Sequence, residues 1–272
     1  MKNRILYTLQ LADNALIYGH RLSEWCGHGP VLEQDIALTN ISLDFLGQAR
    51  GFYQHAANLF NALPLAEKQG MFLSVALEEK VKKGENIDED DLAYLRDGWD
   101  FRNLLITEQP NGDWATTVAR AFYFDTFNHL YYTQLQKSND LQLAAVAEKS
   151  LKEVTYHKRW SSEWVIRLGD GTQESHEKMQ AALNDLWPFT GEMFRMTDVE
   201  QEMADGKTGV DAAALHSQWK QDIVSIIDEA TLQLPEGTRL QDGGKDVRHS
   251  EHLGYILAEL QFIQRAYPGM EW

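Results

Sequence analysis

The chain of 272 residues has 43% hydrophobic and 24% charged residues, the composition of a globular protein that buries a sizeable core. A formal net charge of −16 at pH 7 speaks against general binding to nucleic acid or to an anionic membrane surface. With one cysteine, Cys26, and no apolar run of membrane-spanning length, we expect a cytoplasmic protein without internal disulfides.

Helical periodicity runs through most of the sequence and alternating apolar and polar runs are few, so an all-α fold is predicted. We expect one domain over residues 1–272. Its core is predicted to be a bundle of four long helices, at about 3–26, 33–60, 113–137 and 141–168. Additional helices are expected at about 65–82, 175–203 (with a break before Pro188), 211–234 and 251–267.

The first two bundle helices each place an acid on the stripe that should face the core. Asp13 interrupts the apolar stripe of the first helix, between Leu9 and Leu16. In the second helix, Asp44 shares a face with Ile41, three residues before it. Two inward carboxylates are therefore expected from this hairpin.

The last two bundle helices repeat the pattern. Asp113 and Asp140 are placed to cap them. Asp125 lies in the apolar stripe of the third helix, four residues before His129, and Glu153 lies in that of the fourth helix, four residues before His157. Each helical hairpin thus carries an inward acid on both of its members.

This layout is that of the ferritin-like carboxylate proteins, which hold two irons in a four-helix bundle. They use a lone Glu from each of two helices and a Glu-x-x-His pair from each of the other two. Here the two histidine positions, three residues after Asp44 and after Glu153, are Gly47 and Tyr156. Because two histidine ligands are missing, we predict a degenerate di-iron centre with no metal, no cofactor and no catalytic residue in this chain.

Two points stay open at this stage. His129 and His157 each follow an acid by four residues, so they are possible residual ligands, and the alternative is a self-sufficient di-iron oxygenase with an atypical ligand set. If no metal binds, buried acids need protons, hydrogen bonds or cations. The candidate cations are Arg50, Arg120, Lys152, Arg159, His129 and His157.

Several motifs along the chain resemble one family. They are LSEWCGHGP at 22–30, NISLDFLGQAR at 40–50, FRNLL and EQPNG within 101–112, KEVTYH at 152–157, and GGK with HSEHLG within 243–254. With these motifs the sequence resembles the PaaC family, the structural subunits of the bacterial ring-1,2-phenylacetyl-CoA epoxidase. The segment at 65–86 looks longer than this family needs.

The resemblance implies a ferritin-like fold and a non-catalytic role in a hetero-oligomer. A homologous partner subunit would carry the di-iron site, and further epoxidase subunits and a reductase that relays electrons from NADPH would complete the complex. The reaction implied is epoxidation of the ring of phenylacetyl-CoA in aerobic phenylacetate degradation. A standalone acyl-CoA-binding module is a third hypothesis, which the acidic charge balance disfavours.

Overall fold

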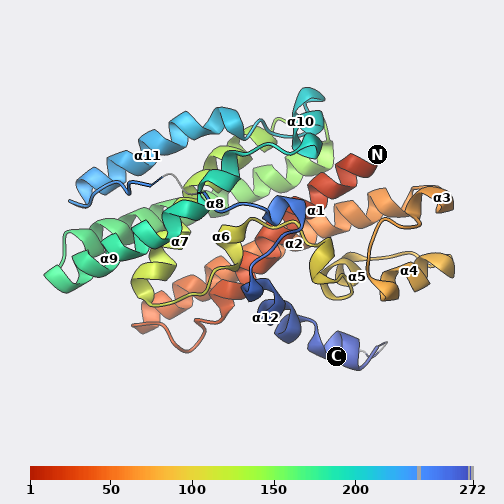
Figure 1. Cartoon of the computed structure of the whole chain (residues 1–272), viewed down its shortest axis with the longest axis horizontal. Helices are drawn as coiled ribbons and strands as arrows, with labels where there is room; N and C mark the ends of the chain where they lie inside the picture. Colours follow the sequence, from red (N-terminus) through yellow and green to blue (C-terminus); the bar gives the residue numbers. More distant parts are fainter. Residues whose placement is uncertain (238–239, 269, 271–272) are drawn as a thin grey trace.

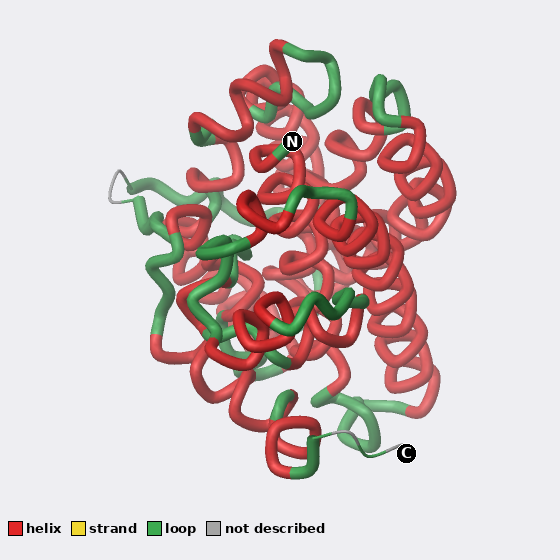
Figure 2. Tube along the Cα trace, turned by 90° about the vertical axis from the view of Figure 1, so that its right-hand side faces the viewer, coloured by secondary structure: helices red, strands yellow, loops and turns green. Residues whose placement is uncertain are grey.

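The computed structural model describes residues 1–237, 240–268 and 270. Within these residues the regular structure is helical, with no strand (Figure 2), and the fold is all-α and ferritin-like. The four long helices are α1 (Lys2–Ser23), α2 (Leu32–Asn61), α7 (Trp114–Leu135) and α8 (Leu141–Gly169). Figure 1 shows them running along one another as two hairpins. Their bounds agree with the predicted bundle helices to within three residues.

Both predicted caps of the second hairpin are present. The Asp113 side chain accepts a hydrogen bond from the backbone N–H of Thr116, and that of Asp140 accepts from the N–H groups of Gln142 and Leu143. Each cap satisfies donors that the first helical turn leaves without a partner, a contribution of about 1 kcal/mol.

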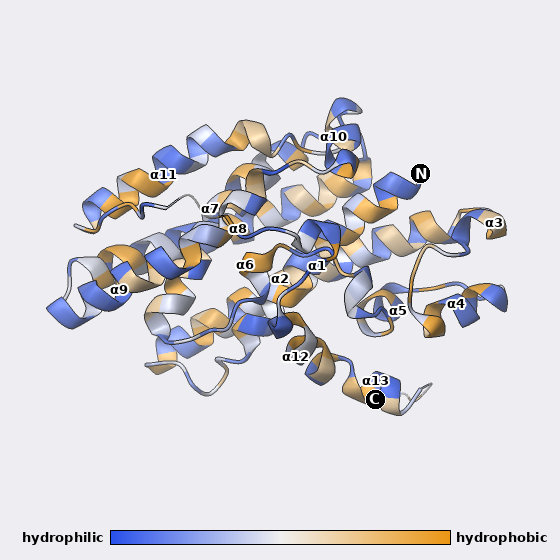
Figure 3. Ribbon diagram, in the orientation of Figure 1, coloured by the Kyte–Doolittle hydropathy of each residue, from blue (hydrophilic) through white to orange (hydrophobic). Residues whose placement is uncertain are grey.

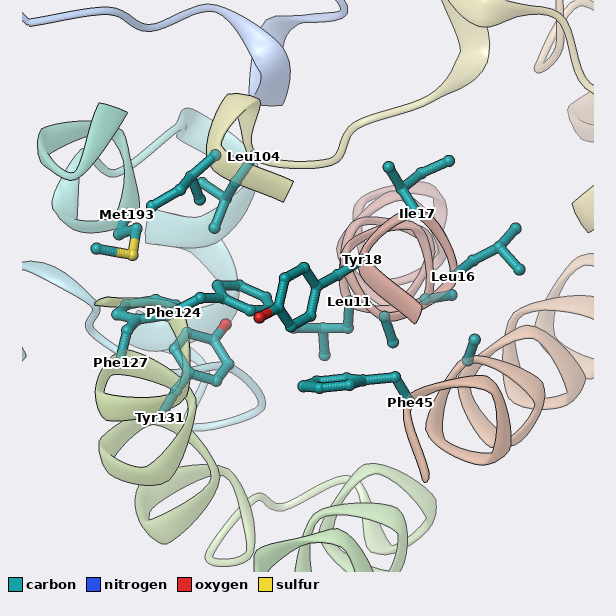
Figure 4. Close-up of a cluster of buried hydrophobic side chains, with 14 of the residues drawn as sticks. Leu11, Leu16, Ile17, Tyr18, Phe45, Leu104, Phe124, Phe127, Tyr131 and Met193 are labelled. Atoms are coloured by element: carbon teal, nitrogen blue, oxygen red, sulfur yellow. The ribbon is translucent and has the colours of Figure 1, made fainter. Parts of the chain in front are cut away.

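The bundle core is rich in aromatic side chains. Tyr18 of α1 lies between Phe45 of α2 and Phe124 of α7, with ring centroids 4.9 and 4.8 Å apart and nearly perpendicular planes (Figure 4). Such edge-to-face pairs add about 0.5–1.5 kcal/mol each beyond the area that they bury. They fix the distance between the two hairpins.

The long connection from α2 to α7 contains short helices only: α3 (Leu65–Lys68), α4 (Val75–Lys82), α5 (Glu89–Tyr94), η1 (Gly98–Asp100) and α6 (Leu105–Glu108). The single helix predicted at about 65–82 is therefore wrong. It is interrupted because Gly70 takes a left-handed conformation, with φ of 71°, and Ser74 caps a new helix through the N–H of Leu77. From this connection, α5 packs against α2.

The C-terminal part forms α9 (Gln173–Leu186), η2 (Trp187–Phe189), η3 (Gly191–Phe194), α10 (Asp198–Asp205), η4 (Ala213–Leu215), α11 (His216–Glu229), η5 (Gly244–Asp246), α12 (Glu251–Leu260) and α13 (Phe262–Ala266). Helices α9 and α11 pack against the second hairpin, whereas α10 and α12 pack against α1 (Figure 1). No helix in the described part of the chain combines the length and the apolar character that crossing a membrane requires.

Three of the predicted C-terminal helices are shorter or broken. The stretch after Pro188 in the 175–203 prediction is two 3₁₀ turns before α10, which starts at a capping box of Thr197 with Glu200. Helix α11 ends at Glu229 rather than 234, just before Thr231 with its positive φ of 58°. The 251–267 prediction divides into α12 and α13 at Gln261.

Candidate functional site

Asp13 is completely buried and forms an ion pair with the completely buried Arg96. The two terminal nitrogens of the Arg96 guanidinium donate to both carboxylate oxygens, and the contact to Oδ2 is 3.2 Å. The Tyr53 hydroxyl donates to Oδ1 at 2.6 Å, and the backbone N–H of Arg102 donates to Oδ2 at 2.9 Å. Both oxygens of Asp13 are thus engaged by protein donors.

Arg96 is itself held from several sides. Its side chain donates to the carbonyl oxygens of Leu92 and Asp100, at 2.6 and 3.0 Å, and its guanidinium lies 4.2 Å from the centre of the Phe101 ring. The pair with Asp13 raises the pKa of Arg96 although burial acts in the opposite direction. The connection between α5 and α6 therefore fixes a permanent positive charge against α1.

Asp44 of α2 pairs with His157 of α8, one of the two histidines proposed as residual ligands. The Nε2 atom of His157 lies 2.9 Å from Oδ2 of Asp44, whose side chain is 36% exposed, while the imidazole is fully buried. The ring of His157 lies beside that of Phe45, with centroids 5.0 Å apart. The opposite ring nitrogen, Nδ1, has no hydrogen-bond partner among the described residues.

Asp125 is the one acid of the set without a partner. It is 1% exposed, and neither of its carboxylate oxygens accepts a hydrogen bond from a described residue. Burial raises the pKa of Asp125 to about 7, and the neighbouring His157 and Ser161 only partly oppose that shift. Burial thus favours the protonated form of this acid.

Glu153 lies half-buried on α8 and accepts a hydrogen bond of 3.0 Å from the Gln48 side chain. Gln48 in turn accepts one of 3.2 Å from the Tyr132 hydroxyl. The two positions that would carry histidines face outward, because Gly47 is exposed and Tyr156 is 41% exposed.

The residual-ligand candidate His129 is half-buried on α7. Burial lowers the pKa of His129, helped by the positive charge of Lys158. Its Nδ1 atom has no hydrogen-bond partner among the described residues. It is not joined to the acids by any ion pair or hydrogen bond in that part of the chain.

A di-iron centre does not fit this donor set. Arg96 occupies the carboxylate of Asp13, the imidazole of His157 is turned to Asp44, and Gly47 and Tyr156 supply no inward nitrogen. Among the described residues, no group of three or more His, Cys, Asp and Glu side chains is placed to hold a metal ion. Three of the four acids are instead engaged by protein groups, namely Asp13 by Arg96, Asp44 by His157 and Glu153 by Gln48.

One of the six candidate partners does contact a bundle acid, whereas the partner of Asp13 is not among them. Of the six candidates, His157 does pair with Asp44, but the cation at Asp13 is Arg96, which lies in a short connection where no periodic pattern marks it. Arg120 is buried in a different place, where it donates to the backbone carbonyl of Gln109.

A second buried polar network joins the motif at 101–112 to that at 243–254. The Glu108 carboxylate accepts from the backbone N–H of Ser250 at 2.7 Å and from Nδ1 of His249 at 2.9 Å. Nε2 of His249 lies 2.9 Å from the carbonyl oxygen of Phe101. Because both ring nitrogens face acceptors, the arrangement favours the protonated imidazole.

The comparisons with known proteins define the class of this chain. All of its residues, 1–272, match the family model described as phenylacetic acid catabolic protein (PaaA_PaaC), so the chain belongs to this family. It is 43% identical, over the full length of both chains, to the C subunit of the 1,2-phenylacetyl-CoA epoxidase of Escherichia coli (strain K12). The resemblance found in the sequence is confirmed.

Proposed function

We propose that this chain is a non-catalytic structural subunit of a multi-subunit phenylacetyl-CoA epoxidase in the cytoplasm. It supports a homologous subunit that carries a di-iron centre, and other epoxidase subunits and a reductase complete the complex. Full-length identity of 43% to a protein named as the C subunit of that epoxidase supports this assignment. The reaction itself then belongs to the partner, and this chain contributes no catalytic residue.

The observation that carries the proposal is that protein groups engage three of the four bundle acids. A carboxylate coordinates a metal through its oxygen lone pairs, and a cation or donor already bound to those oxygens competes with the metal. Asp13 is held by Arg96 and Asp44 by His157, while Glu153 accepts from Gln48. A fold that keeps four acids in the bundle but engages three of them with protein groups supports a scaffold rather than an oxygen-activating enzyme.

Exposed apolar side chains offer surfaces for partner subunits. On α2, Leu32, Ile36 and Leu43 are 71%, 52% and 59% exposed, and their spacing of four and seven residues places them on one helix face. On the C-terminal helices, Tyr255 of α12 is 67% exposed and Phe262 of α13 is 63% exposed. Figure 3 shows hydrophobic residues along both helices. Solvent-exposed apolar groups of this size are typical of contacts between subunits.

Iron analysis tests the assignment. The chain is produced alone and together with its catalytic partner in iron-rich medium, and iron per chain and epoxidation of phenylacetyl-CoA are measured. For the chain alone we expect well below one iron atom per chain and no epoxidation. For the complex we expect both bound iron and epoxidation. Two irons bound to the chain alone would instead establish the self-sufficient oxygenase.

Restoring the missing ligands gives a sharper test. A Gly47→His and Tyr156→His double variant supplies both histidines, yet we expect no stoichiometric iron because Arg96 still holds Asp13. Gly47→Ala with Tyr156→Ala is the matched control for changes in folding. Iron uptake by the histidine variant alone would show that two missing imidazoles are all that separates this chain from a catalytic subunit.

Contacts between subunits are tested separately from iron. Leu43→Lys on the α2 face is expected to reduce recovery of the complex in co-purification, because it places a charge in an apolar contact. Leu141→Lys is the control, since Leu141 is also exposed, at 83%, but stands alone at the start of α8. Equal recovery with both variants would exclude the α2 face as a contact.

A further inference from the structure

The last two helices, α12 and α13, are attached to the connection between α2 and α7 by polar side chains. We call residues 251–266 the C-terminal strap, and Figure 3 shows it at the edge of the bundle, close to α5. Its first part, α12, packs through the buried side chains of Leu253, Ile256 and Leu257. Each residue of its second part, α13, is exposed or half-buried. The far end of the strap is therefore held mainly by hydrogen bonds.

Gln261 and Arg265 make those hydrogen bonds, and both reach the end of α5. The Gln261 side chain, which is 4% exposed, donates to the carbonyl oxygens of Ala93 and Arg96, each at 3.0 Å. The Arg265 side chain donates to the carbonyl oxygens of Tyr94 and Arg96, at 3.1 and 2.6 Å. The last carbonyl groups of a helix have no partner within it, so the strap caps the end of α5.

Arg96 connects the strap to the interior of the bundle. Its carbonyl oxygen accepts from both strap side chains, whereas its completely buried guanidinium pairs with Asp13. Further along the same connection, the backbone N–H of Arg102 donates to Asp13 at 2.9 Å. Because the main chain and the side chain of one residue move together, a displacement of the Arg96 carbonyl group also displaces its guanidinium. The strap and the buried ion pair thus depend on one short piece of backbone.

We propose that the strap and the Asp13–Arg96 pair form one conformational device, in which undocking of the strap opens the connection at 93–102 and releases Arg96 from Asp13. Undocking costs little apolar burial at α13, and segments with few buried apolar contacts are those that open locally. The docked strap keeps Asp13 completely buried, and its release gives solvent and cations access to that carboxylate. Such coupling is reciprocal, so loss of the pair also loosens the strap.

Trypsin detects the released state directly. It cleaves after an arginine whose side chain enters the specificity pocket of the protease, so cleavage after Arg96 requires the guanidinium to have left Asp13. The full-length variant Gln261→Leu with Arg265→Met removes the hydrogen-bond donors of the strap. We expect cleavage after Arg96 and after Arg102 to become roughly ten- to hundredfold faster, because the rate follows the population of the open form.

Cleavage after Arg120, which is completely buried in α7, is the reference for global unfolding. In the unchanged protein we expect cleavage after Arg96 to be faster than cleavage after Arg120 and to depend less on urea, since local opening exposes less surface. Tyr255→Leu with Phe262→Leu is the matched control on the strap, because these side chains are 67% and 63% exposed, and it should leave both rates unchanged.

Two results of this experiment would overturn the proposal. If cleavage after Arg96 and after Arg120 has the same rate and the same urea dependence, the connection opens only when the whole bundle unfolds. If cleavage after Arg96 is local but the variant without the strap donors leaves it unchanged, the connection opens independently of the strap.

Hydrogen exchange tests the coupling in the opposite direction. In Asp13→Asn we expect the backbone amides of residues 261–266 to exchange roughly tenfold faster or more at low urea, because loss of the ion pair favours the released state. Glu163→Gln, which removes an exposed ion pair on α8, is the control and should leave this exchange unchanged. Equal exchange in Asp13→Asn and in the unchanged protein would mean that the strap undocks while the pair stays intact, which contradicts the proposal. Neither measurement requires a partner subunit, so its outcome is separate from that of the proposed function.

Discussion

Removing Asp13 from its ion pair should cost the protein a large part of its stability. In an Asp13→Ala variant the guanidinium of Arg96 stays fully buried but loses both contacts to the carboxylate. Leaving one member of a buried pair uncompensated costs about 3–5 kcal/mol. Since whole domains are stable by about 5–15 kcal/mol, we expect urea unfolding midpoints to fall markedly and the melting temperature to drop by roughly 6–20 °C.

The double variant Asp13→Leu with Arg96→Met isolates the pair. Replacing both members of a buried pair by apolar groups is often close to neutral, so we expect the double variant to be more stable than either single variant. Arg159→Met is the control for loss of a surface pair, because Arg159 and Glu163 are 69% and 55% exposed, and it should change stability by no more than about 0.5 kcal/mol. A single-variant cost below about 1 kcal/mol, or a double variant that simply adds the two single costs, would refute the reasoning.

Three further predictions concern pH and close packing. Burial raises the pKa of Asp125 from 3.8 to about 7, so the contribution of Asp125 makes the free energy of unfolding fall as pH rises between those values. Asp125→Asn should therefore reduce the difference in unfolding free energy between pH 5 and pH 7.5, measured by urea unfolding, by roughly 2–3 kcal/mol. Burial lowers the pKa of His249, but Glu108 outweighs burial and the net shift of the pKa is upward. The contribution of the His249–Glu108 pair to stability is therefore fully present below pH 6.5 and is lost as pH rises through the raised pKa. His249→Gln should therefore reduce the loss of melting temperature between pH 6 and 9, and an unchanged slope would contradict the assigned pair. Gly169→Ala should destabilise by about 1–3 kcal/mol because its Cβ would lie 2.4 Å from a backbone oxygen, whereas Gly47→Ala, with open space around it, should stabilise a helix by about 0.5–1 kcal/mol in the same unfolding assay.

Helix periodicity predicted the bundle well because its signal is local. Apolar positions at steps of three and four fix which face of a long helix turns inward, and the capping residues Asp113 and Asp140 mark where two helices start. Short helices between them carry too few turns for that signal. The helix predicted at 65–82 is interrupted at Gly70, which takes a left-handed backbone conformation. The residue pattern does not reveal that conformation.

Depth of burial was harder to predict than direction. All four acids were expected inside, and Asp13 and Asp125 are, but Asp44 and Glu153 lie only half-buried. The described C-terminal helices pack against α1 and the second hairpin, and α2 packs against α1, α5 and α8, which leaves the outer face of α2 open. A helix phase gives the direction of a side chain, whereas its exposure depends on what later parts of the chain cover.

Arg96 could not be found from the sequence for a related reason. It is separated from Asp13 by 83 residues and sits in a connection, where neither a period nor a cap constrains the side chain. The contact exists because the short segment around η1 lies over α1 and α2, and the Tyr53 hydroxyl and the Phe101 ring complete its surroundings. Pairing across a fold is set by the path of the loops, which single-sequence patterns do not report.

The four acids are accommodated in four different ways. Asp13 has a guanidinium, Asp44 an imidazole and Glu153 an amide as partner, while burial raises the pKa of Asp125 to about 7. A shared metal would have required all four to point their lone pairs at one centre, and each present partner satisfies its acid independently. Because three of the acids have separate partners, we expect that no single substitution would create such a centre. Under the proposed function, the bundle would serve for packing against other subunits without the common site around which metal-binding bundles are built.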